Sequence, residues 1–320
     1  MVKNIIESEC IDVGCASNDN YAQHMGVMIY SLLENCSCPE KVRFFVLGSE
    51  ISSQNRARLE SISKKFGSKM IFLNADMSLL KNIKTYRHLG VAAYLRFQLI
   101  DGVKVKKLIY LDCDIVVEGD IKSLFDIDIG DNILLAVRDP GIPASKKKLL
   151  NMSPGRFYFN SGVLVINCDK WKSENVTRQV LAYIEKDSNK IEFADQDALN
   201  VILSKSWKQI DISWNVITRF FYSKIFPWIK IYDYSKEEIK RVNKNQKIIH
   251  YATTIKPWFF LDVNPLKKRY WYYLKKTPWR DYRAPDSSFL GMYKRMGDYL
   301  DFVLSKGKYL WGSKMVRIRN

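Results

Sequence analysis

The chain has 320 residues, 47% of them hydrophobic, and a formal net charge of +17. This length suits one or two domains with a large buried core, and the composition excludes an intrinsically disordered chain. No apolar run approaches the ~20 residues that a membrane span needs. The N-terminal segment "MVKNIIESECID" lacks the apolar core of a signal peptide, so the sequence predicts a cytoplasmic protein.

Short apolar, β-rich runs alternate with helix-like segments from residue 11 to about residue 250. The predicted strands are Val42–Leu47, Met70–Leu73, Leu108–Leu111, Ile133–Val137 and Val163–Asn167. The predicted helices are Tyr21–Glu34, Ser53–Phe66, Ala92–Ile100 and Lys170–Glu185. Near-continuous apolar runs indicate strands buried on both faces, and the alternation favours a mostly parallel α/β sheet. In such sheets, ligands bind beyond the C-terminal ends of the strands.

The cysteines do not form a pattern typical of a metal cluster or a disulfide scaffold. None of the six belongs to a CxxC pair, and four of them have apolar neighbours. The six are Cys10, Cys15, Cys36, Cys38, Cys113 and Cys168. We therefore expect buried free thiols.

Two acids, Asp112 and Asp114, directly follow the strand Leu108–Leu111 in "KLIYLDCDIVV". Residues two apart in an extended chain project to the same side, so both carboxylates can face one ligand crevice. Like charges this close repel each other, and burying them without compensation is costly. A hard cation between them, Mg²⁺ or Mn²⁺, removes this cost and leaves positions for substrate phosphates. The alternative is an ordinary Asx turn at a strand end.

His250 is the candidate for a third metal ligand. It follows the short β-like run Ile248–Ile249 in "KIIHYATTIKPW". The chain has two other histidines: His24 in a predicted apolar helix, where we expect a core or boundary residue, and His88 in a polar loop. A lone histidine after a strand is ordinarily structural, but the paired acids make ligation by His250 a second interpretation.

The C-terminal part of the chain is basic and aromatic. From Asn264 to the end it holds 14 Lys and Arg, 4 Asp and Glu, and 12 aromatic residues. We predict one domain over residues 1–263 and an extension over residues 264–320, with a helix from Phe289 to Leu304 that packs on the main domain or contacts a membrane. Basic residues interleaved with Trp and Tyr suit an anionic membrane surface, and they also suit nucleic acid or plain solvent. We favour peripheral contact with the inner face of the cytoplasmic membrane over binding of nucleic acid.

Several segments, taken in order, resemble glycosyltransferase family eight, and in particular its bacterial lipopolysaccharide-core glucosyl- and galactosyltransferases. They are "ASNDNYAQHMGVMIYSLL", "AAYLRFQL", "KLIYLDCDIVV", "FYFNSGVLVIN", "ADQDALN" and "HYATTIKPW". The resemblance runs from about Ile11 to about Arg283. It implies a Rossmann-like GT-A fold, flanked by helices and followed by the basic aromatic helical extension. It also implies transfer of glucose or galactose from a UDP-sugar to a glycan or a lipid-linked saccharide, with retention of the anomeric configuration.

The same resemblance implies roles on the nucleotide side of the donor. Asp112, Asp114 and His250 match the ligands of a Mn²⁺ ion on the diphosphate, with Mg²⁺ as the other candidate cation. The further donor-binding residues it implies are Ala16, Asn18, Asn20, Tyr21, Arg96, Cys113 and Lys256. The family commonly has an acid at the position of Asn18, whose amide can still bond the uracil edge. Without the resemblance, "ASNDNY" would be a turn that caps the next helix.

On the sugar side, the resemblance implies that Asn160, Asp195 and Gln196 surround the donor sugar and that Asp139 lies toward the acceptor. By the same resemblance, Gln196 is the residue nearest to the reactive face of the sugar, and an amide is a poor nucleophile. We therefore predict front-side displacement, with a covalent intermediate through Asp195 as the alternative. Thr253 stands where the family often has glycine, in a loop that closes over the diphosphate.

Two rival functions remain. The segment "DCDIV" superficially resembles the nucleophile motif of haloacid-dehalogenase-like phosphatases, but over 100 residues precede it here and no convincing match to the later paired-acid motif of those enzymes follows. A glycosyltransferase fold that merely holds a glycan is the other rival. The presence of Asp112, Asp114 and His250 speaks against that loss of activity.

Overall fold

The computed structural model describes residues 10–76, 91–187, 189–253, 256–288, 290–293 and 296. His88 and most of the helix expected from Phe289 to Leu304 lie outside the described residues.

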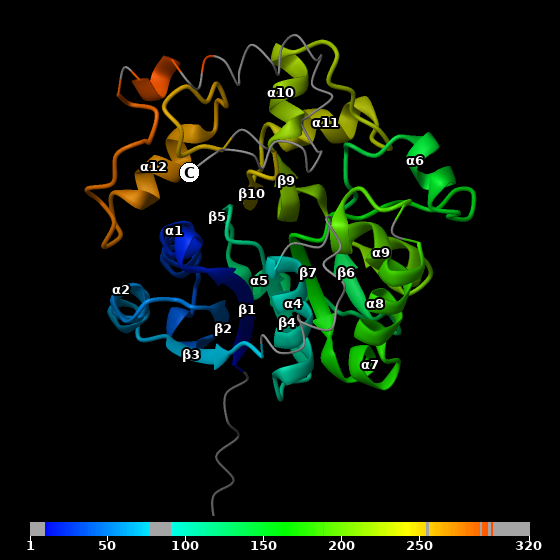
Figure 1. The fold of residues 1–320 in the computed structure, drawn as a ribbon, viewed down its shortest axis with the longest axis horizontal. Helices are drawn as coiled ribbons and strands as arrows, with labels where there is room; N and C mark the ends of the chain where they lie inside the picture. Colours follow the sequence, from blue (N-terminus) through cyan, green and yellow to red (C-terminus); the bar gives the residue numbers. More distant parts are fainter. Residues whose placement is uncertain are drawn as a thin grey trace, which may run out of the picture.

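A seven-stranded sheet forms the centre of the described part of the chain (Figure 1). Its strands are β1 (Ile11–Asn18), β2 (Val42–Ser49), β3 (Lys69–Asn74), β4 (Lys107–Leu111), β6 (Leu134–Ala136), β7 (Val163–Asn167) and β8 (Trp207–Gln209). They are ordered β3-β2-β1-β4-β7-β6-β8 across the sheet. Only β7 runs antiparallel to its neighbours in this sheet, so the predicted mostly parallel arrangement is confirmed.

The helices of the described residues are α1 (Ala22–Glu34), α2 (Ser53–Lys65), α4 (Val91–Gly102), α5 (Ile121–Phe125), α6 (Ala144–Leu149), α7 (Cys168–Ser173), α8 (Val176–Lys186), α9 (Ala194–Ile202), α10 (Arg219–Ile225), α11 (Lys236–Val242) and α12 (Lys267–Leu274). Helices cover both faces of the seven-stranded sheet: α1 and α2 pack in one core cluster, and α4, α7, α8 and α9 pack in the other. Short 3-10 turns are η1 (Asp19–Tyr21), η2 (Pro39–Lys41) and η3 (Ile212–Asn215). The predicted strands and the first three predicted helices match observed elements within a few residues.

The single helix predicted over Lys170–Glu185 is wrong, because the structure has two helices there, α7 and α8. Asn175 separates them with a left-handed φ of +52°. Asparagine tolerates this conformation better than most residues, so the chain can end one helix and start the next in a new direction.

The apolar side chains of β4 show how the core is divided. Ile109 and Leu111 belong to one buried cluster, which includes residues of α1, α2 and α12. Leu108 and Tyr110 belong to a second cluster, formed with α4, α7, α8 and α9. Each of these four side chains is at most 2% exposed, so β4 is buried on both faces as its apolar run predicts.

A second, three-stranded sheet has the order β5-β10-β9, with β5 (Ile115–Val117), β9 (Val216–Ile217) and β10 (Ile248–His250). His250 pairs with Ile115 of β5 and with Ile217 of β9. Because β5 follows β4 after only three residues, this pairing brings the end of β10 to the C-terminal end of β4. Residues more than 130 positions apart in the sequence thereby become neighbours.

The described part of the C-terminal extension packs against α1. Trp279 lies so close to Gly26 that a Cβ atom on Gly26 would be 2.4 Å from the indole Cζ3 atom. The Tyr270 hydroxyl contacts the side chains of Gln23 and His24. The Asp286 carboxylate accepts hydrogen bonds from the backbone N–H groups of Phe260 and Leu261, so the extension is joined to the preceding loop as well.

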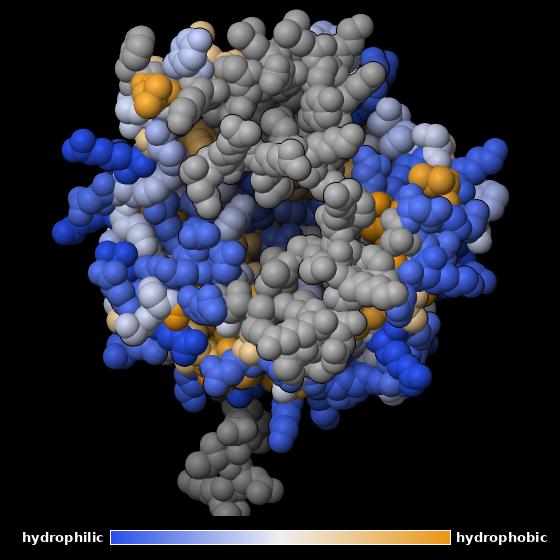
Figure 2. Space-filling model, in the orientation of Figure 1, coloured by the Kyte–Doolittle hydropathy of each residue, from blue (hydrophilic) through white to orange (hydrophobic). Residues whose placement is uncertain are grey.

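None of the helices in the described ranges combines the length and the apolar character that crossing a membrane requires. The face of the molecule in Figure 2 is mostly hydrophilic, with hydrophobic residues in scattered patches.

Candidate active site

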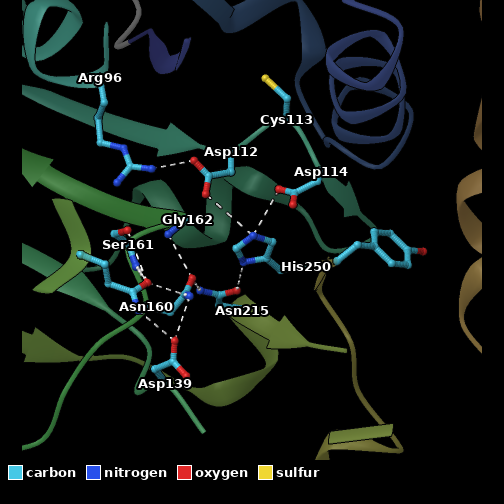
Figure 3. A network of polar contacts seen from close by, with 12 residues as sticks. Arg96, Asp112, Cys113, Asp114, Asp139, Asn160, Ser161, Gly162, Asn215 and His250 are labelled. Atoms are coloured by element: carbon cyan, nitrogen blue, oxygen red, sulfur yellow. Dashed lines mark hydrogen bonds and ion pairs between the residues drawn. The ribbon is translucent and has the colours of Figure 1, made fainter. Parts of the chain in front are cut away.

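Asp112 and Asp114 lie between β4 and β5, and His250 ends β10. The Nε2 atom of His250 lies 3.2 Å from Oδ1 of Asp114 and 3.8 Å from Oδ2 of Asp112. One potential ligand atom from each of the three residues lies within 4.8 Å of the others, in the only such group of ligands among the described residues. The carboxylates project to the same side, as their spacing predicts, and meet the imidazole there (Figure 3).

Gly162 provides the room for this convergence. A Cβ atom at this position would lie 2.2 Å from Cε1 of His250 and 2.7 Å from Oδ2 of Asp112. The Gly162 carbonyl also accepts a hydrogen bond from the Asp112 N–H at 2.9 Å. A larger residue would therefore displace either the imidazole or the carboxylate.

The ligand set suits a divalent cation. Two carboxylate oxygens are preferred by hard cations, and one imidazole nitrogen is better accepted by Mn²⁺ than by Mg²⁺. The exposed fraction of the side chain is 28% for Asp112, 13% for Asp114 and 3% for His250, so the group opens on the side of Asp112. This arrangement leaves one side accessible to a ligand and keeps the imidazole buried.

Lys256 pairs with Asp114. Its Nζ lies 2.6 Å from Oδ2 of Asp114 and donates a second hydrogen bond, 2.8 Å long, to the carbonyl of Tyr251. Burial alone would raise the pKa of Asp114, but Lys256 and His250 outweigh it and hold this pKa well below its usual value. Asp114 is therefore ionised throughout the physiological pH range.

Arg96, on α4, lies on the other side of the acids. Its guanidinium donates to Oδ1 of Asp112 at 2.7 Å and also pairs with Asp195 at the start of α9. The guanidinium stacks over the Tyr110 ring, 4.4 Å from its centroid. Burial raises the pKa of Asp195 above its ordinary value, and the charge of Arg96 opposes that rise. The predicted helix residue Arg96 is thus buried and bound to two of the predicted site residues.

Asn160, Gln196 and Asp139 form one buried network next to the acids. The Asn160 amide donates to Oε1 of Gln196 at 2.9 Å and to Oδ2 of Asp139 at 3.1 Å. The Gln196 amide donates to the same Asp139 oxygen at 3.1 Å. Burial raises the pKa of Asp139, and hydrogen bonds from Gly141 and Asn160 oppose the rise. These three predicted residues are brought together, each at most 6% exposed.

The predicted nucleotide loop is more open. Ala16 is buried within β1, whereas Asn18 and Asn20 are exposed and Tyr21 is 37% exposed. Asn18 precedes η1 but makes no side-chain capping hydrogen bond, which leaves its amide available to a ligand. Tyr21 packs edge-on against Trp258 at a centroid distance of 5.9 Å. In Figure 2 a recess opens near the middle of the molecule, and the visible atoms around it are mostly hydrophilic.

Two further predicted residues have buried side chains. Cys113 points away from His250 (Figure 3), and its thiol donates to the carbonyl of Ala16 at 3.8 Å. Burial raises the pKa of this thiol well above its ordinary value, so it is not a reactive thiolate. Thr253 is 1% exposed and lies just after β10.

Sequence reasoning missed three residues of the site. Asn215 contacts the imidazole of His250, Gly162 makes room for it, and Ser161 donates its N–H to Oε1 of Gln196 at 3.0 Å. Gly162 and Ser161 lie in the segment "FYFNSGVLVIN", which carries part of the family resemblance. The resemblance therefore pointed to this segment but not to the roles of these two residues. For Asn215 the signal is weak: it is a polar residue beside the apolar run of β9.

Comparisons with known proteins identify the family of this chain. The profile of Glycosyl transferase family 8 matches residues 12–262. General stress protein A of Bacillus subtilis is 32% identical over 278 residues, covering 85% of this chain and 96% of that protein. Lipopolysaccharide 1,3-galactosyltransferase of Salmonella typhimurium is 25% identical, covering 85% and 80%. The crystal structure of the galactosyltransferase LgtC with donor and acceptor sugar analogues superposes with a TM-score of 0.72 at 24% identity, covering 85% and 99%. The likeness confirms the predicted GT-A fold.

Proposed function

The chain belongs to Glycosyl transferase family 8 and is a glycosyltransferase, and from that membership we propose that it moves glucose or galactose from a UDP-sugar to a saccharide acceptor. The proposed reaction depends on a divalent cation and retains the anomeric configuration. The chain is related to lipopolysaccharide glucosyl- and galactosyltransferases, so a lipopolysaccharide core sugar or another cell-surface glycan is the proposed acceptor. The observation that carries this proposal is the convergence of Asp112, Asp114 and His250 beside Gly162. Membership of the family excludes the phosphatase alternative.

The proposed chemistry begins at the donor diphosphate. Asp112, Asp114 and His250 would hold Mn²⁺, or else Mg²⁺, which supplies positive charge to the leaving UDP when bound. Lys256, which pairs with Asp114, would add a further positive charge for the same diphosphate. Arg96 orients Asp112 through its hydrogen bond and keeps the neighbouring Asp195 carboxylate paired.

The sugar-side network supports front-side displacement. A covalent intermediate needs a free carboxylate as the nucleophile. The Asp195 carboxylate is buried and paired with Arg96, and the amide of Gln196 is bound by Asn160 and Asp139. We therefore propose that these side chains bind and orient the sugar, while the departing phosphate receives the proton of the acceptor hydroxyl. Asp139 is proposed to act on the acceptor side, through the loop that it closes with Gly141.

The test is release of UDP from a panel of UDP-sugars with and without Mn²⁺. We expect slow, Mn²⁺-dependent hydrolysis of one sugar, which identifies the donor. Asp114→Asn should abolish it, while Asp126→Asn at an exposed position should not. Absence of both turnover and metal-dependent UDP-sugar binding in the wild-type protein would instead support an inactive, glycan-binding protein.

A second proposal concerns the extension, for which we keep the boundary between residues 263 and 264. The surface of α12 exposes Lys268, Tyr272 and Lys275, and Tyr272 is 53% exposed. Cations around an exposed aromatic ring suit the headgroup region of an anionic bilayer. We propose that this surface holds the enzyme at the membrane that carries a lipid-linked acceptor.

Vesicles of mixed neutral and anionic lipids test the membrane proposal by cosedimentation at moderate salt. The double variant Lys268→Glu/Lys275→Glu should bind less than the wild-type protein. The control Lys186→Glu/Lys205→Glu makes the same charge change at two exposed positions near α8 and α9, on the opposite side of the molecule, and should bind normally. Equal binding by all three proteins would contradict the proposal.

A further inference from the structure

We infer that Asn215 is a positioning residue that holds the His250 imidazole with a proton on Nδ1, so that Nε2 faces Asp112 and Asp114. The inference deepens the proposed function, because it concerns the same cation site, but it rests on a chain of hydrogen bonds that begins at the backbone.

The first step fixes the orientation of the Asn160 amide. The backbone N–H of Gly162 can only donate, and it points to Oδ1 of Asn160 at 3.0 Å. That atom of Asn160 must therefore be the oxygen. The other side of the amide, Nδ2, then faces Gln196 and Asp139 as a donor.

A second backbone group requires the same orientation independently. The N–H of Ser161 donates to Gln196 at 3.0 Å, so the atom of Gln196 that receives it is the oxygen Oε1. Asn160 also contacts this oxygen, at 2.9 Å, and must do so with its amide nitrogen. Two neighbouring N–H groups of the backbone thus orient one side chain without conflict.

The second step passes this orientation to Asn215. One end of the Asn215 amide lies 2.9 Å from Oδ1 of Asn160, and since that oxygen accepts, this end must be the nitrogen Nδ2. The opposite end, Oδ1, lies 3.0 Å from Nδ1 of His250. An amide oxygen only accepts, so Nδ1 must carry a proton (Figure 3).

The third step concerns the other ring nitrogen. With Nδ1 protonated, the lone pair that the neutral imidazole can offer to a cation is on Nε2, which lies 3.2 Å from Asp114. A cation ligand needs this lone pair, and the partner of the second nitrogen decides which tautomer is present. Asn215 is completely buried and ends η3, directly before β9, which pairs with the strand of His250. The ring direction and the proton on Nδ1 are therefore fixed before a cation arrives.

Nitrogen-15 NMR of histidine side chains measures this directly, because the chain has only three histidines. The His250 signals are assigned by comparison with His24→Asn and His88→Asn variants. We expect Nδ1 of His250 to be protonated in the metal-free full-length protein. Finding Nδ1 unprotonated, with the proton on Nε2, would overturn the inference.

Three variants separate positioning from mere packing. Asn215→Leu removes the acceptor at similar volume, and we expect its His250 to shift toward the Nε2–H tautomer, donating to Asp114. Its affinity for Mn²⁺ alone, measured by electron paramagnetic resonance, should fall by about 10- to 100-fold. Asn215→Asp keeps an acceptor and should keep the Nδ1 proton. Thr218→Val is the control, because this buried hydroxyl has no hydrogen-bond partner among the described residues.

Each outcome decides the question. Unchanged tautomer and unchanged Mn²⁺ affinity in Asn215→Leu would show that Asn215 does not position the ring. If Asn215→Leu fails to fold, the wild-type spectrum and Asn215→Asp still test the Nδ1 proton. A wild-type protein with protonated Nδ1 but no Mn²⁺ binding would support the inference and contradict the proposed cation dependence, so the two failures are distinguishable.

Discussion

His24 and His250 are both almost completely buried, at 7% and 2% exposed, yet the regions around them are opposite in character. His250 faces two acids and an amide. His24 stacks on Trp258 at a centroid distance of 3.6 Å and contacts the hydroxyl of Tyr270 at 2.6 Å. Burial lowers the pKa of His24 to about 3, so this imidazole is neutral. A histidine thus belongs to a polar group of candidate ligands in one region. In the other it belongs to the contact of α1 with Trp258, Tyr270 and Trp279, which we call the aromatic joint.

The comparison shows what burial means in each region. Both ring nitrogens of His250 face polar partners, Asn215 on one side and the two acids on the other, so burial preserves the orientation of the ring. Around His24, the ring mainly fills space between the helix α1 and the segment from Trp258 to Tyr270, so burial contributes apolar contact. The expectation that His24 is a core or boundary residue is confirmed.

Replacing each of the two histidines by alanine should give the largest difference in effect between the two regions. We expect His250→Ala to lower Mn²⁺-dependent turnover by more than about 100-fold, because loss of an outer partner of a metal ligand already costs about 10- to 100-fold. His24→Ala should leave Mn²⁺ affinity nearly unchanged and lower the melting temperature instead. Paired measurements of turnover and thermal unfolding check this contrast, which would collapse if both variants lost activity equally while remaining folded.

Gly162→Ala tests whether the His250 region tolerates any added volume. The new methyl group would overlap the imidazole and the Asp112 carboxylate, so we expect Mn²⁺ affinity to fall by about 10- to 100-fold. Circular dichroism should show a folded protein. Wild-type affinity in this variant would mean that the site is wider than its geometry indicates.

Gly26→Ala makes the corresponding change in the aromatic joint. Its methyl group would meet Trp279, and overpacking of this kind costs about 1–3 kcal/mol of unfolding free energy. Gly102→Ala is the matched control, since α4 ends there and nothing lies within 4 Å of the added atom. We expect the control to be neutral or slightly stabilising in urea unfolding. Equal stability of both variants would show that the joint adapts readily.

The smallest predicted effect is a dependence of stability on pH. His24 has a pKa of about 3 in the folded chain, below the value of about 6.5 in the unfolded chain. The unfolded chain therefore binds more protons between these values, and the free energy of unfolding should fall as pH drops below about 6.5, by up to about 1.4 kcal/mol per pH unit. His24→Gln should flatten this slope in urea titrations between pH 7 and pH 5. An unchanged slope would assign the dependence to other groups.

Much of this protein follows from the sequence alone. Local periodicity predicted five strands of the large sheet, β2, β3, β4, β6 and β7, and the helices α1, α2 and α4, because these depend on which side chains alternate within a short window. The predicted burial on both faces holds for β4 but is wrong for β3, where Ile71 is 37% exposed. The two-residue spacing of Asp112 and Asp114 predicted a shared side for their carboxylates, and the ordered segments identified the family. The sequence did not predict the helix break at Asn175, because the helix propensity of this residue differs little from that of its neighbours.

Only the tertiary structure decided how the site is held. Pairing of β10 with β5 brings His250 to Asp112 and Asp114, which lie more than 130 residues earlier in the sequence. Pairing of β10 with β9 places Asn215 against the His250 ring. Gly162 matters because of what lies beside it, and the state of His250 follows from hydrogen bonds that start at two backbone N–H groups. Such contacts are non-local, so no pattern within one segment encodes them; they exist only once the strands have paired.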